Sequence, residues 1–74
     1  MLLSECSVRD KLIITSVLKE NKTAMRLSNI GIEKGTQISV VRALKGNKAM
    51  IISLLGKAVI LSKSATDVVV VERV

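Results

Sequence analysis

The sequence contains no histidine, no proline and no aromatic residue, and it has a single cysteine, Cys6. Without histidine the chain lacks the commonest general base and the commonest transition-metal ligand. Without aromatic side chains it lacks the usual groove for proline-rich peptides and the stacking platform of most proteins that bind single-stranded nucleic acid. One cysteine excludes an internal disulfide, and we interpret Cys6 as a small, partly buried apolar residue rather than a reactive thiol.

Other residues that catalysis or metal binding would need are missing or scattered. Gly31 and Gly35 lack the following Gly-Lys-Ser or Gly-Lys-Thr of a phosphate-binding loop. Cys6 and dispersed carboxylates cannot form an intrachain site for ferrous iron. We therefore expect no catalytic residue, no metal site and no cofactor, and we predict that the protein is not an enzyme. The acids are Glu5, Asp10, Glu20, Glu33, Asp67 and Glu72.

Long hydrophobic runs are also missing, whereas a spanning helix needs about 20 consecutive apolar residues. Ser53, Gly56 and Ser62 interrupt the longest apolar stretches. The beginning of the chain lacks the basic and hydrophobic regions of a secretory signal. We expect a cytoplasmic protein whose 74 residues form one domain, residues 1–74.

Positive charge is in excess, with a formal net charge of +6. Such a charge attracts phosphates, anionic lipid headgroups and acidic protein surfaces alike. The composition therefore predicts the sign of a partner's charge and leaves its chemical class open. Proximity to a membrane and weak self-association stay open as well.

The apolar residues are mainly valine, isoleucine and leucine, which favour strands. Ala24, Leu27 and Ile30 recur at intervals of three and predict one short helix over residues 23–30. Residues 62–67 are predicted to form a polar turn or a single helical turn. Strands are predicted over residues 11–18, 36–44, 49–55, 58–61 and 68–74.

Cap and turn residues separate these elements. Asn21 or Thr23 is the expected N-cap of the helix. Gly31 is the expected helix stop, because glycine enters the left-handed conformation without a Cβ penalty, and Ile32 should then fold back onto the last turn. The other structural turns are assigned to Gly35, Gly46 and Gly56.

The predicted core is entirely aliphatic. Four consecutive valines, residues 68–71, indicate a strand that is contacted on both faces or that closes a barrel between two neighbours, because an exposed edge of this kind would promote aggregation. We predict a mainly β fold, a small, partly open SH3-like or OB-like barrel of about five strands with one short helix. The predicted core residues are Ile14, Leu27, Ile30, Ile38, Val40, Ile52, Leu54, Val59, Leu61 and alternate valines of the last strand.

Residues 26–41 read RLSNIGIEKGTQISVV. This segment resembles the core motif Arg-Leu-x-x-Leu-Gly-Leu-x-x-Gly-x-x-Ile-x-Val of the ferrous iron transport protein A (FeoA) family. Two regions depart from the family pattern. The central turn keeps Leu44 and Gly46 of the family's Pro-Leu-Gly-Asp-Pro but has neither proline. Before the first strand, Arg9 and Asp10 stand where the family has a glycine. The matching residues are Arg26, Leu27, Ile30, Gly31, Ile32, Gly35, Ile38 and Val40.

The resemblance implies an SH3-like fold and a non-catalytic role as the cytosolic partner of a FeoB-type ferrous iron permease, whose cytoplasmic portion carries a GTPase domain. A similar barrel is attached to iron-dependent and manganese-dependent repressors. Because 74 residues leave no room for the DNA-binding and metal-binding domains of these repressors, we expect a separate accessory protein of iron transport. Any link to iron then runs through the partner.

The predicted partner-binding residues are Lys22, Arg26 and Asn29. Lys22 and Arg26 lie one helical turn apart and should project together toward an acidic surface of the permease, on the side of the helix away from Leu27. Arg26 has an alternative structural role of equal weight, in which its guanidinium caps carbonyl groups or its stem covers the core.

The alternative function is a basic RNA-binding or ribosome-associated barrel, since such barrels are small and basic and residues 34–41 and 45–48 are similar to a KOW-type loop. The missing aromatic residues and the six acids argue against a dense phosphate-binding surface. We therefore expect no stable complex with nucleic acid.

Overall fold

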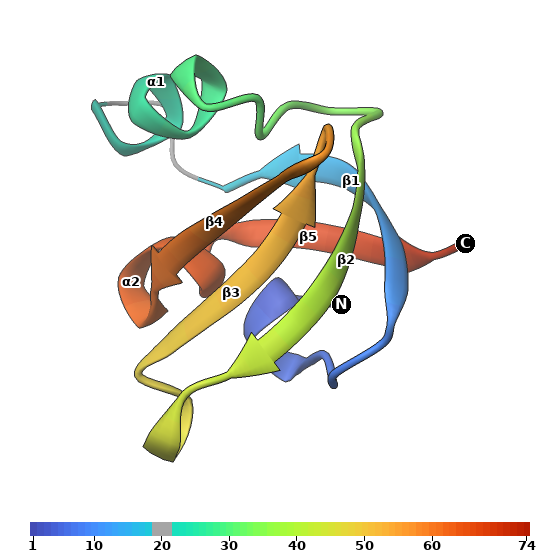
Figure 1. Cartoon of the computed structure of the whole chain (residues 1–74). Helices are drawn as coiled ribbons and strands as arrows, with labels where there is room; N and C mark the ends of the chain where they lie inside the picture. The colour runs from blue at the N-terminus through green and yellow to red at the C-terminus, as the bar shows by residue number, and fades with distance from the viewer. Residues whose placement is uncertain (19–21) are drawn as a thin grey trace.

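The computed structural model describes residues 1–18 and 22–74, which form five strands, two α-helices and two 3-10 turns (Figure 1). All strand pairs are antiparallel, in the order β4-β3-β2-β1-β5, and the sheet curls without closing between β4 and β5. This confirms the predicted mainly β, partly open barrel. The elements are η1 Leu3–Glu5, β1 Lys11–Val17, α1 Lys22–Asn29, β2 Gln37–Ala43, η2 Lys45–Asn47, β3 Ala49–Leu54, β4 Lys57–Ser62, α2 Lys63–Thr66 and β5 Val69–Arg73.

Two hairpins join β2, β3 and β4 along the chain. The second has a two-residue turn between the paired residues Leu54 and Lys57, and both turn residues have positive φ, 51° at Leu55 and 79° at Gly56. This geometry matches the right-handed twist of the strands that it joins. Residues 62–67, predicted as a polar turn or one helical turn, contain the single turn of α2.

The interior is filled from every strand and from three connecting segments. Most of the predicted core is confirmed, whereas Val59 is only half-buried and Ile30 is exposed. The buried core also contains residues that the predicted core list did not include, namely Leu3, Cys6, Leu12, Ile32, Met50 and Val68. The buried residues that were predicted are Ile14, Leu27, Ile38, Val40, Ile52, Leu54, Leu61, Val69 and Val71.

The prediction for Ile30 was wrong because the helix ends in a chain reversal. The amide of Ile32 donates to the carbonyl of Leu27 at 2.8 Å, and the amide of Gly31 donates to the carbonyl of Ser28 at 3.0 Å. These two bonds form a Schellman motif around Gly31, whose φ is 101°. The reversal leaves Ile30 44% exposed and carries Ile32, 1% exposed, into the core.

The start of α1 lies at the limit of the described residues. Of the two predicted N-caps, Asn21 is outside the described residues, and Thr23 lies within the helix rather than before it.

Strand β5 lies between β1 and the first residues of the chain. Leu2 forms a bridge with Val70, and the amide of Val71 donates to the carbonyl of Met1 at 2.7 Å. Val69 and Val71 are buried, while Val70 is half-buried. The valine strand therefore has a neighbour along each edge, as in the second of the two predicted alternatives, but it does not close the barrel.

We expect Ile32→Ala to lower the free energy of unfolding by about 2 to 5 kcal/mol, because it removes a fully buried side chain. The matched change Ile30→Ala removes the same atoms from a half-exposed position and should cost about 1 kcal/mol or less. Urea denaturation of both variants measures the difference. Equal costs would contradict the observed chain reversal.

We also expect Gly31→Ala to cost about 1 kcal/mol or more, since an L-residue is strained at this positive φ. The new Cβ would lie 3.4 Å from side-chain atoms of Leu54 and Leu55, at the close limit of van der Waals contact, so the cost comes mainly from the backbone conformation. The melting temperature measures the cost. An unchanged value would remove Gly31 as the residue that ends the helix.

Candidate functional site

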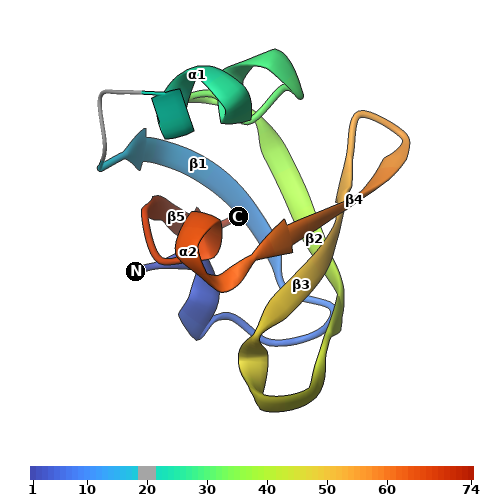
Figure 2. The same ribbon diagram turned by 90° about the vertical axis from the view of Figure 1, so that its left-hand side faces the viewer.

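Helix α1 lies on the outside of the barrel beyond the end of β1, at the top of both views (Figures 1 and 2). Leu27 packs into the core and Ala24 is half-buried. The opposite side is exposed and carries the three predicted partner-binding residues, Lys22, Arg26 and Asn29. Helix α1 is therefore attached to the barrel along one side, and its other side is exposed.

The three residues share one stripe, because their positions follow the i, i+4, i+7 spacing of a helix face. Met25 belongs to the same stripe at position i+3 and is 68% exposed. Its flexible, polarisable side chain is suited to an adaptable contact. The sequence prediction missed Met25, although the same helical spacing identifies it. We call Lys22, Met25, Arg26 and Asn29 the α1 stripe.

Within the described residues, neither Lys22 nor Arg26 forms an ion pair. The side chain of Arg26 is exposed, so its stem does not cover the core as one form of the structural alternative requires.

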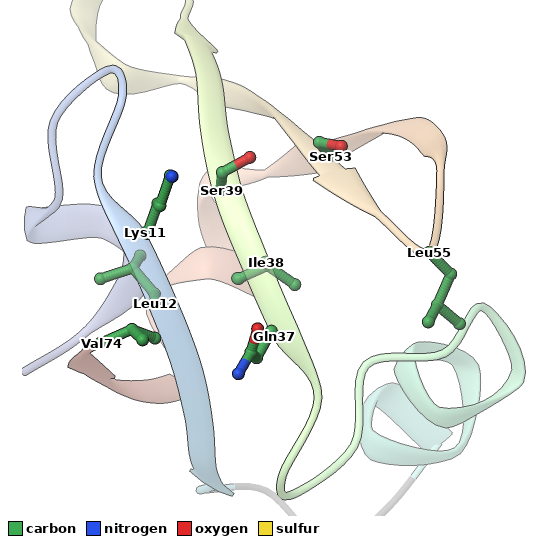
Figure 3. A pocket seen from close by; sticks show the side chains of 8 residues that line it. All are labelled: Lys11, Leu12, Gln37, Ile38, Ser39, Ser53, Leu55 and Val74. Carbon is green, nitrogen blue, oxygen red and sulfur yellow. The ribbon is translucent and has the colours of Figure 1, made fainter.

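A shallow groove of about 330 Å³ crosses the outer face of β1, β2 and β3 and extends to the β3–β4 turn (Figure 3). Its polar floor follows from the strand register, which places Lys11 opposite Ser39 and Ser39 opposite Ser53. None of the side chains that line it carries a carboxylate, thiol or imidazole group. The lining residues are Lys11, Leu12, Gln37, Ile38, Ser39, Ser53, Leu55 and Val74.

Cys6 is buried, and its thiol donates a weak hydrogen bond to the carbonyl of Leu2 at 3.5 Å. Burial, followed by the negative charge of Asp10, raises the pKa of the Cys6 thiol. A raised pKa disfavours the reactive thiolate. Cys6 is therefore a structural residue, as interpreted from the sequence.

Several carboxylates serve local structure. Glu5 accepts the amide of Leu2 at 2.8 Å, and Glu33 accepts the hydroxyl of Ser28 at 2.6 Å. The carboxylate of Asp67 forms an ion pair with Lys63 at 3.0 Å. Hydrogen bonds from Lys63 and then from Ser4 lower the pKa of Asp67.

Across residues 1–18 and 22–74, no three histidine, cysteine, aspartate or glutamate side chains gather closely enough to hold a metal ion. The α-helices have eight and four residues, and the described ranges contain no helix with the length and hydropathy of a membrane span.

Comparison with known proteins identifies the family. The family model for the FeoA domain matches residues 1–73. No curated protein matches the chain.

Solved structures have the same fold. A FeoA-like protein from Clostridium acetobutylicum superimposes with a TM-score of 0.90 at 23% identity, over 99% of this chain and 85% of that chain. The crystal structure of an iron uptake regulatory protein (FeoA) gives a TM-score of 0.90 at 25% identity, over 100% and 97% of the two chains. The manganese-activated repressor ScaR gives 0.89 at 16% identity, and the match covers 100% of this chain and 35% of the repressor. Because the domain model covers almost the whole sequence, the chain belongs to the FeoA family, which is linked to ferrous iron uptake.

Proposed function

We propose that the protein is a non-catalytic, cytoplasmic accessory of ferrous iron uptake that binds the cytoplasmic part of a FeoB-type permease. The observation that carries this proposal is the α1 stripe, which places two cations and an exposed methionine on one side of a helix whose other side is anchored by Leu27. Family membership supports the link to iron transport.

The chemistry of the α1 stripe suits an acidic protein surface. Two positive charges one helical turn apart guide association with a negative surface, and Met25 adds apolar contact area between them. Asn29 extends the stripe with an amide that can both donate and accept hydrogen bonds. The permease surface that fits it would be acidic around an apolar centre.

The scattered ligands support a role in regulation or stabilisation of the permease rather than in carrying iron. Ferrous iron favours imidazole and carboxylate ligands held close together, and the chain has no histidine. The RNA-binding alternative has less support, because family membership points to transport and no aromatic side chain is available for base stacking.

The double change Lys22→Glu and Arg26→Glu should weaken binding to the purified cytoplasmic part of the permease by roughly 1 to 3 kcal/mol, more at low salt than at high salt. The melting temperature should stay nearly unchanged, because both side chains are exposed. Isothermal titration and thermal unfolding of the same samples measure the two effects.

Arg9→Glu is the control for the double change, since it makes at one position the same change of charge as each of the two substitutions. Arg9 is also exposed, but it precedes the start of β1, whereas α1 follows the other end of that strand. The Arg9→Glu variant should therefore bind the cytoplasmic part of the permease about as well as the unchanged protein. Unfolding of the double variant would support the structural role of the pair, and full binding by a folded double variant would eliminate α1 as the docking surface.

We expect the purified monomer to bind ferrous iron only weakly and without a defined stoichiometry, because its oxygen ligands are scattered. Calorimetric titration under anaerobic conditions measures this. Stoichiometric, submicromolar binding by the monomer would contradict the proposal. A Cys6→Ser variant tests for a site shared between two chains, since it would abolish binding only if the thiol were a ligand.

A further inference from the structure

The net positive charge is confined to one half of the sheet. Residues 34–66, which form β2, β3, β4 and α2, contain six of the twelve cations and none of the six acids, so the rest of the chain is balanced at six against six. All six cations are exposed, and within residues 1–18 and 22–74 only Lys63 forms an ion pair, with Asp67. They are Lys34, Arg42, Lys45, Lys48, Lys57 and Lys63.

Strand β4 forms the free edge of this positive half. It is the terminal strand of the sheet and pairs only with β3. The amide of Lys63 donates to the carbonyl of Lys48 at 2.9 Å, which fixes the alternation of hydrogen-bonded pairs along the hairpin. Val59 and Leu61 therefore direct their backbone groups toward β3, while Ala58 and Ile60 direct theirs away from the sheet.

The two edges of the sheet differ. At β5 the edge is covered by Met1 and Leu2. At β4, in the described part of the chain, the amide and carbonyl groups of Ala58 and Ile60 have no backbone partner. The fold thus protects one edge and leaves the other available to a further strand.

Nothing within β4 blocks such pairing. Residues 58–61 are apolar, without charge or proline. Ile60 is 66% exposed, and the strand register places it beside Ile51 on the outer face, with Arg42 on the far side of Ile51. The edge has an apolar centre, and Lys57 lies at its start.

We propose that the free edge of β4 binds an extended, acidic segment of a partner protein, which adds to the sheet as a further strand. Its backbone would pair with Ala58 and Ile60, its apolar side chains would cover Ile60 on the outer face, and its alternate carboxylates, on the opposite face, would lie near Lys57. This surface is separate from the α1 stripe, and the inference does not depend on the partner of α1.

Charge and geometry select this occupant over two others. A second copy of the chain would bring a second positive half against the first, and like charges oppose that pairing. A nucleic acid is attracted by the charge but cannot supply the alternating amide and carbonyl groups of a strand. An acidic peptide carries the opposite charge and also supplies amide and carbonyl groups that can pair with those of β4.

The test uses a synthetic peptide of about eight residues with alternating valine and glutamate, long enough to span an average strand. Amide hydrogen exchange is followed by NMR in the intact chain. On saturation with the peptide, exchange at Ala58 and Ile60 should slow by about ten-fold or more. Val59 and Leu61 are internal controls, because β3 protects their amides before the peptide is added.

A valine–lysine peptide of the same length is the matched control and should protect neither amide. Ile60→Pro removes the backbone amide of residue 60, which points away from the sheet, and an edge strand tolerates proline at such a position. This variant should abolish protection of the Ala58 amide by the peptide. Ile60→Val keeps the amide of residue 60 and should retain the protection. Lys57→Glu is the second variant, in case the proline variant fails to fold. It should weaken peptide binding more than Lys22→Glu, which makes the same charge change on α1.

Three results would overturn the proposal. The first is unchanged exchange at Ala58 and Ile60 with saturating valine–glutamate peptide. The second is protection of these amides that rises with protein concentration in the absence of peptide, which would identify a second copy as the occupant. The third is tighter binding of a single-stranded oligonucleotide that leaves both amides exchanging fast, which would make the positive half a nucleic-acid surface.

Discussion

One curled sheet has to enclose a complete core without any aromatic side chain, and this constraint governs the rest of the structure. No aromatic ring is present to fill a large volume, so many small contacts replace a few large ones. The strands cannot close the core by themselves. Leu3 of η1, Leu27 of α1 and Ile32 after the helix enter the interior from outside the sheet. The connecting segments are therefore parts of the core as well as links between strands.

The same constraint explains how α1 can be attached to the barrel while most of its side chains stay exposed. Leu27 and the chain reversal at Gly31 tie the C-terminal end of the helix to the barrel. Among the helix side chains that the structure describes, only Leu27 is fully buried. The other side chains of α1 that the structure describes are half-buried or exposed.

Features encoded by neighbouring residues could be predicted from the sequence. The helix stop at Gly31, the turn at Gly56 and the alternation that buries Ile38 and Val40 depend on local backbone preferences and on the period of a strand. The helical period predicted Ile30 to be buried, because a periodic pattern does not reveal where the chain reverses. Lys22 and Arg26 were selected as site residues by their spacing.

The outer groove and the free edge of β4 could not be predicted in this way. The groove brings Lys11, Ser39 and Ser53 together from three strands, and their alignment depends on register. The free edge depends on strand order, since a sequence indicates that residues 58–61 form a strand but not that the strand is terminal. Both features belong to the tertiary structure and have no local signal.

The pairing of β1 with β5 has a consequence for the rate of folding. Strands β2, β3 and β4 meet through short turns, whereas the hydroxyl of Thr15 reaches the carbonyl of Val70 across a separation of 55 residues. Bringing such distant segments together costs chain entropy before the contacts form, and non-local pairing of this kind slows folding. The three-stranded half can form early from local hairpins, but the core stays incomplete until β5 docks on β1. We therefore expect closure of this long loop to be slower than formation of the β2–β3–β4 hairpins.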